Sequence, residues 1–573
     1  MQIAQPLNTD QKQKNTLQFP AFSMLAGERA LIGAHLLVAF AALSIGIFLG
    51  PFQTFRRAPA MQMEIPIFSY YYQALTLHGI LNALVFTTFF IMGISYFVTQ
   101  RSLERPLRSI PAAWLSFVMM AVGLVLTGGA VLAGEATVLY TFYAPMVAHP
   151  IFYIGLVLVV VGSWVGAGNV FLTYFDWRRD HPGERVPLAV FALVCNFVMW
   201  CTASLGVAVE ILFMLLPLSL GLIDTTDVQV SRIFFWFFGH PLVYFWLLPA
   251  YVSWYTMLPI QLGVRLFSDS MARVAFLMLM IFSIPVGVHH LYVDPGISES
   301  AKIMHGMLTF VVAIPSFLTA FNVAATIERA GRKRGGKGLF GWIIKQPWGN
   351  PVVAAQYGGM WLFIFGGITG VMNASFNMNV ALHNTTWIVG HFHITVGGAV
   401  FMTYMGITYW LLPIIRGRKL WTKNVALAQV YLWFFGMLIF SGSMGRAGIE
   451  GAVRRSDIGA AGAYVPAGAV DWLNLTAVAG GLLLLSSICL YLVLIGTLLI
   501  SKEPLTEEAP ITTKAPIITK ASQREPIPAI LENWRLWVTV VILSNVIMWG
   551  PVLVNALDIT LGFWAVGDPG AAR

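Results

Sequence analysis

Long apolar runs separated by short polar segments cover most of the chain. A helix that crosses a bilayer needs about 20 mostly apolar residues, and about thirteen runs meet that length. Some of them exceed the bilayer thickness, an excess that helix tilt can absorb. The pattern predicts an all-α polytopic membrane protein, a bundle of about 13 transmembrane helices. The predicted spans lie near residues 29–51, 70–98, 110–133, 149–175, 187–219, 230–258, 271–293, 301–327, 352–374, 384–413, 425–449, 468–500 and 532–556.

The composition agrees with a membrane protein. Of the 573 residues, 58% are hydrophobic and only 10% are charged, whereas soluble domains carry about 25% charged residues. Soluble enzyme folds are therefore excluded for most of the chain, and the net charge of +9 requires no nucleic-acid partner. The three cysteines form no C-x-x-C pair, which excludes a Cys-ligated iron–sulfur cluster, covalent c-type haem attachment and a disulfide framework.

Basic residues alternate between the connecting segments. Those after the even-numbered predicted spans are rich in Lys and Arg, whereas those after spans three, five, seven and nine have almost none. The positive-inside rule then predicts a prokaryotic cell membrane protein with its N-terminus in the cytoplasm and its C-terminus outside. The predicted parts are a cytoplasmic segment 1–28, a core of twelve spans 29–500, a Pro/Thr/Lys-rich cytoplasmic linker 501–531, and a last span with an outer tail 532–573.

Two outer segments break this charge pattern. One contains Arg56 and Arg57, and the other contains Arg446, Arg454 and Arg455. Either the membrane tolerates these charges locally, or the arginines hold bound anions.

Six histidines fall within predicted spans, where a polar side chain is costly and indicates a function. Counting at about 1.5 Å per residue places all six within roughly 5–15 Å of the outer surface. Four separate spans thus bring imidazoles to one layer. Isolated helix–helix hydrogen bonds would not produce such a layer, so we expect a shared metal or haem assembly. The six residues are His78, His240, His289, His290, His391 and His393.

Helical phase divides these histidines. His391 and His393 are two residues apart and point about 200° away from each other, so they serve two different centres. The adjacent His289 and His290 can converge on one ion from a helix end. Imidazoles suit copper, iron and zinc, and the layer lacks the carboxylates that calcium and magnesium prefer. With His240, the adjacent pair makes a copper site, which leaves three histidines for a six-coordinate and a five-coordinate haem iron.

Four segments resemble subunit I of the heme–copper oxidases. They are LTLHGILNALVF (75–86), FFGHPLVYFWLLPAY (237–251), SIPVGVHHLYVDPG (283–296) and NTTWIVGHFHITVGG (384–398). The similarity extends over almost the whole chain, and the combination of motifs is specific. Within the family, the chain is most similar to the B family and its ba-type cytochrome c oxidases.

The resemblance implies two haems. His78 and His393 would ligate a low-spin haem, expected to be b-type. His391 would be the proximal ligand of a high-spin haem, expected to be a-type. Arg454 and Arg455 match arginines that bind haem propionates, since fixed cations pair well with carboxylates.

The resemblance also implies a copper ion, CuB, held by His240, His289 and His290, with Tyr244 linked covalently to His240. Dioxygen would be reduced to water between the high-spin haem iron and CuB. Cleaving the O–O bond takes four electrons delivered almost together, and Tyr244 can supply one electron and a proton. This tyrosine lies one helical turn from His240, on the same face of the predicted helix.

Polar side chains below the metal layer match the family's single K-type proton pathway, and proton pumping is expected with it. Tyr244, Tyr251 and Tyr255 descend one predicted span, and Ser316 and Thr319 lie at similar depth on another. In the alternative interpretation, Ser and Thr only bond back to carbonyls of their own helix.

Two positions depart from relatives. Leu242 replaces the Glu that ends a second proton pathway in mitochondrial-type oxidases, so that pathway is expected to be missing, as it is in the B family. Asn379 replaces an Asp that lies near a haem propionate in the nearest relatives, which places any proton-loading role there in doubt. His383 is a candidate to contact the propionate region, whereas His35, His149, His181 and His305 receive no role.

No Cys-Met-His cluster for a dinuclear copper occurs in this chain. The family supplies that centre in a second subunit, so we expect subunit II as a partner, cytochrome c as the donor, and small membrane subunits. A quinol oxidase of the same family is the first alternative. A nitric oxide reductase, whose non-haem iron requires carboxylate ligands, is the second. A secondary transporter with a histidine proton relay is the third.

Overall fold

The computed structural model describes residues 26–68, 70–458, 460, 464–505 and 527–567, with side chains from 27 to 557. Most of the predicted N-terminal segment 1–28 and of the linker 501–531, and the end of the tail 532–573, lie outside these residues. Within the described residues the chain is helical, with only isolated β-bridges between extended residues. The predicted all-α fold class is confirmed.

Twenty α-helices occur in the described residues, joined in places by short π-helical and 3₁₀ segments. The α-helices are α1 (Ala26–Arg57), α2 (Tyr71–Gly79), α3 (Thr87–Leu103), α4 (Ile110–Leu132), α5 (Pro150–Asp180), α6 (Leu188–Glu210), α7 (Leu216–Ser219), α8 (Val228–Val252), α9 (Leu258–Leu262), α10 (Asp269–Ser283), α11 (Glu299–Val311), α12 (Ala313–Lys333), α13 (Gly341–Ile344), α14 (Pro351–Ala374), α15 (Phe376–Leu382), α16 (Thr386–Phe392), α17 (Phe401–Arg416), α18 (Lys423–Ile449), α19 (Val470–Ile495) and α20 (Trp534–Gly567). The other segments are η1 (Ile80–Phe86), η2 (Ile211–Leu215), η3 (Ser253–Met257), η4 (Val288–His290), η5 (His393–Val400), η6 (Ala467–Ala469), η7 (Gly496–Ile500) and η9 (Ala529–Glu532).

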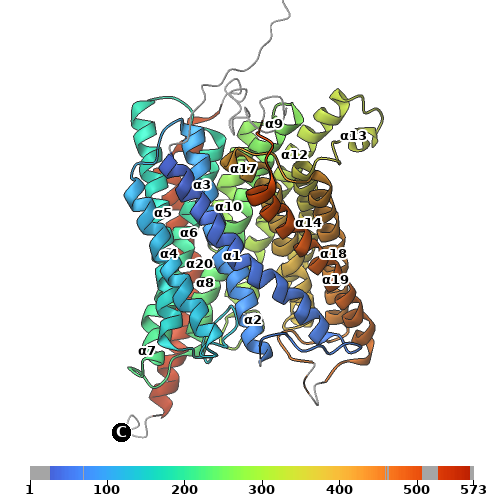
Figure 1. The fold of residues 1–573 in the computed structure, drawn as a ribbon. Helices are drawn as coiled ribbons and strands as arrows, with labels where there is room; N and C mark the ends of the chain where they lie inside the picture. Colours follow the sequence, from blue (N-terminus) through green and yellow to red (C-terminus); the bar gives the residue numbers. More distant parts are fainter. Residues whose placement is uncertain (1–25, 69, 459, 461–463, 506–526, 568–573) are drawn as a thin grey trace, which may run out of the picture.

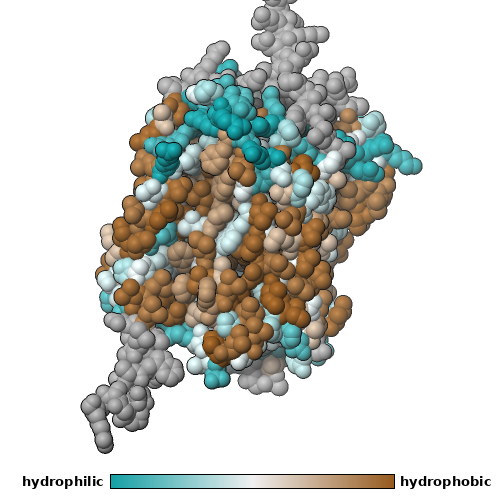
Figure 2. Space-filling model, turned by 90° about the vertical axis from the view of Figure 1, so that its left-hand side faces the viewer, coloured by the Kyte–Doolittle hydropathy of each residue, from teal (hydrophilic) through white to brown (hydrophobic). Residues whose placement is uncertain are grey.

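The long helices run side by side as one bundle, with α9 and α13 at one end and the last turns of α20 at the other (Figure 1). On the face that Figure 2 shows, apolar side chains form a broad belt and hydrophilic side chains gather toward the two ends. Among the described residues, twelve helical segments are long and apolar enough to cross a membrane. The protein is therefore a polytopic membrane protein.

The seventh predicted span, 271–293, differs from the other twelve. Its helix α10 has only 15 residues and ends at Ser283. The chain continues without regular structure to Gly287 and then forms the short 3₁₀ turn η4, which contains His289 and His290. Pro285 lies in this interval, and a proline cannot donate the backbone hydrogen bond that would continue the helix.

Capping residues fix where several spans begin. The side chains of Ser109, Asp227, Ser268, Asn350 and Thr385 each accept a hydrogen bond from a backbone N–H two or three residues further on. These bonds satisfy donors that the first helical turn leaves unpaired. Helices α8 and α16, which contain His240 and His391, therefore start at defined positions.

Candidate metal and haem centres

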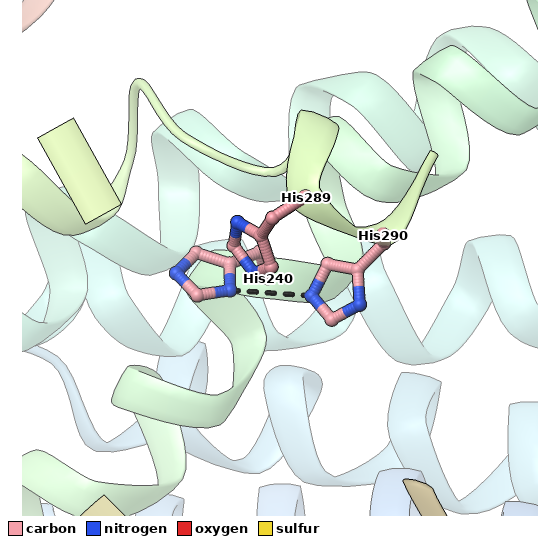
Figure 3. Close-up of side chains that lie close together, drawn as sticks. All are labelled: His240, His289 and His290. Atoms are coloured by element: carbon pink, nitrogen blue, oxygen red, sulfur yellow. Dashed lines mark hydrogen bonds between the residues drawn. The ribbon is translucent and has the colours of Figure 1, made fainter. Parts of the chain in front are cut away.

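The side chains of His240, His289 and His290 meet at one point (Figure 3). Helix α8 contributes His240, and the turn η4 contributes the other two. One potential ligand atom of each imidazole lies within 4.8 Å of the corresponding atoms of the other two. His240 Nδ1 is 3.3 Å from His290 Nε2, and the rings of His240 and His289 are 4.3 Å apart. Three neutral imidazoles with converging nitrogens fit a copper, iron or zinc ion.

Aromatic residues enclose this histidine trio. The ring of Trp236 stacks on His290 at 3.9 Å with an angle of 10° between the planes. Tyr244 lies one turn along α8 from His240, with 5.1 Å between the ring centroids. Nε2 of His240, the nitrogen that does not face His290, is buried without a hydrogen-bond partner. The covalent bond between Tyr244 and His240 remains a prediction, and the two rings are neighbours.

A hydrogen bond orients His289. Its Nδ1 is 3.1 Å from the hydroxyl of Thr309 on α11. That hydroxyl donates its only hydrogen to the carbonyl of His305, at 2.6 Å. The Thr309 oxygen must therefore accept from His289 Nδ1–H, which leaves Nε2 of His289 with a lone pair for a metal. Such outer partners fix the tautomer of a metal-binding histidine.

His78 and His393 form a second, separate centre. Their ring centroids are 6.2 Å apart and their planes differ by 9°. With a metal–nitrogen distance of roughly 2 Å on each side, this spacing accommodates one ion between the rings. Each histidine lies at or just before the start of a π-helical segment: His78 is two residues before η1, and His393 is the first residue of η5. Such segments are rare and occur frequently at functional sites.

Backbone carbonyls orient both of these rings. His78 Nδ1 lies 2.7 Å from the carbonyl oxygen of Gly46, and His393 Nδ1 lies 2.8 Å from that of Val389. A carbonyl only accepts, so each Nδ1 donates and each Nε2 keeps a lone pair. Two Nε2 atoms facing one cavity are the ligand set of a six-coordinate haem iron.

The same device orients His391, two residues before His393. Its Nδ1 is 2.8 Å from the hydroxyl of Thr369 on α14, and this hydroxyl donates to the carbonyls of Phe365 and Gly366. The Nε2 of His391 is again left as the free ligand atom. The partners of His391 thus differ from those of His393, whose ring faces His78. The assignment of the two histidines to two centres stays a prediction.

One cavity extends from the His78–His393 pair to the loop that contains Arg454 and Arg455. Its walls are mostly apolar and include Phe392 and Phe440, and one end is lined by Arg57, Arg454 and Arg455. An apolar cleft with two axial nitrogens and a cationic end fits a haem with its two carboxylates. The residues present therefore suit the group that the sequence predicts.

The outer arginines fall into two classes. Arg56 is paired with Asp457 at 2.9 Å, and Arg446 with Glu450 at 3.2 Å. The three arginines of the cavity have no carboxylate partner among the described residues. Arg454 donates to Asn384 Oδ1, Arg455 donates to the Tyr143 hydroxyl at 3.2 Å, and Arg57 donates to the backbone carbonyls of Val453 and Ser456. Sequence analysis identified Arg57 as misplaced charge but missed its place in the cavity.

The arginines perturb their neighbours. Burial lowers the pKa of Arg454 to about 10, and the charge of Arg455 acts in the same direction. Burial alone would raise the pKa of Tyr143, but the charges of Arg455 and Arg232 outweigh it and lower this pKa. Burial, together with the charge of Arg454, lowers the pKa of His383 to about 4. The cationic end thus favours anions and neutral imidazole.

The predicted proton-pathway residues lie in one buried region between α8 and α12. The Tyr255 hydroxyl donates to Thr319 Oγ1 at 2.8 Å. The Tyr251 hydroxyl lies near Ser316 and Thr319, but no hydrogen bond joins it to a partner. Ser316 and Thr319 also bond to carbonyls of their own helix at 3.4 and 2.9 Å, as the alternative interpretation predicted. The contacts therefore fit both interpretations.

A second buried series of hydrogen-bonded polar side chains, not predicted from the sequence, lies beside these residues. Ser253 donates to Gln356 Oε1 at 2.7 Å, and Gln356 donates to Gln261 Oε1 at the same distance. These residues come from α14 and from the π-helical and helical end of the α8 span. Polar residues inside predicted spans were the signal that the sequence offered. A single Gln or Ser in a span, however, does not indicate a particular function.

The two residues that depart from relatives, Leu242 and Asn379, are both buried. Leu242 is buried, 3% exposed, within the apolar core. The Asn379 amide donates to the carbonyls of His289 and Asn373, at 3.1 and 2.7 Å. An ionised carboxylate cannot donate these bonds, so Asn379 supports the turn that contains His289 and His290 in a way that Asp would not.

Comparison with known proteins agrees with this geometry. Residues 30–483 match the family described as Cytochrome C and Quinol oxidase polypeptide I. The chain is 42% identical to cytochrome c oxidase subunit 1 of Thermus thermophilus, over 91% of this chain and 93% of that protein. It is 26% identical to ubiquinol oxidase subunit 1 of Acetobacter aceti, over 67% of this chain and 58% of that protein.

A solved structure is similar as well. The fold matches that of a heme–copper terminal oxidase dimer determined by cryo-EM, with a TM-score of 0.88, 38% sequence identity and coverage of 93% of both chains. The sequence match, the fold match and the two imidazole centres point the same way. The chain belongs to the cytochrome c and quinol oxidase polypeptide I family, and is thus subunit I of a heme–copper oxidase.

Proposed function

We propose that this chain is the oxygen-reducing subunit of a ba-type terminal cytochrome c oxidase. The observation that supports it most directly is the arrangement around α16. His393 joins His78 in one cavity, while His391, two residues away, is oriented by Thr369 near the separate trio of His240, His289 and His290. One helix thus presents an axial ligand to each of two centres.

The protein residues have distinct roles in this proposal. His78 and His393 hold the low-spin haem, expected to be b-type, and His391 holds the high-spin haem, expected to be a-type. The trio holds CuB. When bound, the high-spin haem and the copper would supply the oxygen-binding metals and most of the electrons for the reduction of dioxygen.

Tyr244 supplies what these groups do not. Its ring neighbours His240, and in this proposal its hydroxyl gives one electron and one proton to oxygen. Tyr251, Tyr255, Ser316 and Thr319 resupply the proton from the cytoplasmic side through the single K-type pathway, and pumping accompanies this uptake. Arg454 and Arg455 hold the haem carboxylates, because they line the cationic end of the cavity.

The proposed setting is a prokaryotic cell membrane with the N-terminus in the cytoplasm and the C-terminus outside. Subunit II, with a dinuclear copper centre, would deliver electrons from cytochrome c on the outer face, and small membrane subunits complete the complex.

The observations support the three alternative functions to different degrees. Relatives include both cytochrome c and ubiquinol oxidases, so a quinol donor is the second candidate. A nitric oxide reductase would need a carboxylate at the metal, but the group of three ligating side chains found among the described residues contains histidines only. Glu210 lies outside this group and accepts from Ser231 at 2.7 Å. A transporter does not agree with the family.

The test uses the purified native complex. We expect two haems and one copper per chain besides the copper of subunit II, a reduced-minus-oxidised spectrum with low- and high-spin components, and oxygen consumption with reduced cytochrome c. Oxygen consumption with quinol alone would transfer the proposal to the quinol oxidases. A preparation without haem or copper would contradict both.

A further inference from the structure

The copper-ligand segment consists of residues 284–290 and contains His289 and His290. It lies among membrane-spanning helices, where non-helical backbone is rare. After α10 ends at Ser283, residues 284–287 form no helix before the turn η4. In a membrane, backbone groups outside helices must find partners inside the protein, because lipid offers none. Whatever covers this segment therefore influences where His289 and His290 stand.

Helix α20 covers the segment. Its buried residues are spaced three or four apart and form one face, while most of the rest of the helix is exposed. Trp549 belongs to this face, is 1% exposed, and lies against Gly287, where an added Cβ would come within 2.8 Å of the indole ring. Beyond the turn, Asn555 Nδ2 donates to the carbonyl of Gly296 at 2.7 Å. The buried face consists of Val541, Asn545, Met548, Trp549, Val552 and Ala556.

His305 connects α20 to the copper ligand itself. Its Nε2 lies 2.9 Å from the carbonyl oxygen of Met548, so this nitrogen donates, and its fully buried ring packs on Trp549 at 4.8 Å. The carbonyl of His305 accepts from Thr309, and Thr309 accepts from His289 Nδ1. A continuous series of contacts thus runs from α20 through α11 to His289.

The N-terminal end of α20 is also anchored to the rest of the bundle. Glu532, just before the helix, accepts from the buried Arg273 of α10 at 2.8 Å, and Arg273 also pairs with Asp269 at 2.6 Å. Helix α20 therefore cannot shift relative to α10 without breaking buried ion pairs, which is costly. This helix lies outside residues 30–483, the part that matches the family.

We propose that α20 is a brace for the copper-ligand segment, and that Trp549 and His305 are positioning residues for His289 and His290. The inference rests on the proposed copper site. Loss of an outer partner of a metal ligand typically lowers metal affinity about 10–100-fold, so the same range is expected when the brace is removed.

The test compares purified complexes of Trp549→Leu, His305→Leu and His305→Gln with wild type and with Trp537→Leu. Trp537 is on the same helix, but its indole N–H donates to the nearby Ile530 carbonyl, which makes it a matched control. Copper and haem are counted after dialysis against a copper chelator. Trp549→Leu and His305→Leu are expected to lose copper about 10-fold or more faster than wild type while the low-spin haem spectrum is retained. His305→Gln keeps an N–H donor and should restore much of the copper.

The proposal is overturned if both leucine variants keep copper as wild type does, or if they lose copper and low-spin haem in equal proportion. It is equally overturned if Trp537→Leu loses copper as fast as Trp549→Leu. Copper-free wild type would instead contradict the proposed function. In that case amide hydrogen exchange still decides on the brace, because exchange over residues 284–296 should rise in Trp549→Leu and stay unchanged in Trp537→Leu.

Discussion

The two candidate metal-binding regions are built differently. His78 and His393 project from spans that are helical on both sides of the ring, and the backbone carbonyls of Gly46 and Val389 orient them. His289 and His290 stand on a 3₁₀ turn after non-helical backbone, and a side chain, Thr309, orients the first of them. The first centre depends on helices alone, whereas the second depends on what packs around a loop. Substitutions in the two regions should therefore behave differently.

Removing one ligand from each centre should have the largest effect. His393→Ala is expected to eliminate the low-spin haem signal, and His289→Ala to eliminate CuB while the low-spin haem remains. Oxygen consumption should fall in both by more than the roughly 10–100-fold that loss of an outer-shell partner costs. Spectra, copper analysis and an oxygen electrode measure these effects. The exposed His149→Asn is the control, and a normal low-spin spectrum in His393→Ala would contradict the assignment.

Removing the hydrogen bond that orients a ligand histidine should have a smaller effect, which differs between a ligand on the loop and a ligand on a helix. Thr309→Val preserves shape but removes the acceptor for His289 Nδ1, so copper affinity should fall by about 10–100-fold. Thr369→Val does the same for His391, which remains on a regular helix, and should change the high-spin haem content far less. Titration of copper against a competing chelator and haem extraction compare the two. Equal losses in both variants would mean that the loop is no more sensitive than the helix.

Charge at the end of the haem cavity should have a smaller effect. Arg455→Leu removes a cation that has no carboxylate partner among the described residues, and charge-assisted hydrogen bonds contribute about 1.5–3 kcal/mol. Since a nearby positive charge favours the reduced haem, its loss should lower the midpoint potential of the low-spin haem. Redox titration followed in the visible spectrum measures this. Arg446→Leu, which removes a paired cation, should leave the potential nearly unchanged.

The smallest predicted effect concerns pH. The pKa of His383 is lowered from 6.5 to about 4, first by burial and then by the charge of Arg454. The unfolded chain therefore binds more protons than the folded chain between these values, and stability is lost as pH falls from 6.5 toward 4. His383→Gln should reduce this loss by no more than about 2 °C in Tm. Thermal unfolding at pH 7 and pH 4.5 tests it, and a loss of equal size in wild type and variant would exclude the role of His383.

Much of the fold could be predicted from the sequence, because each span is marked by the hydropathy of its own consecutive residues. Apolar runs predicted the spans, and the spacing of His391 and His393 predicted two centres on one helix. The end of α10 at Ser283 was missed, since the apolar residues from Ile284 to Val288 continue the hydrophobic run. Pro285 and Gly287 were the available signals for a break.

Contacts between distant segments were beyond sequence analysis. Nothing near His305 indicates that it bonds to the Met548 carbonyl, 243 residues further along the chain. Arg57 was noticed for its charge, but its place in the haem cavity depends on how α1 packs against the loop around Arg454. Such partners follow from tertiary packing and not from local pattern.

The near-parallel orientation of His78 and His393 has a consequence for electron flow. Because the carbonyl of Gly46 on α1 and that of Val389, one turn before His393 on its own helix, already hold the rings, the two ligands would need little movement when an iron between them changes oxidation state. A small reorganisation energy makes electron transfer fast at a modest driving force. With the proposed haem bound, the backbone carbonyls of Gly46 and Val389 would thus suit this centre to relaying electrons.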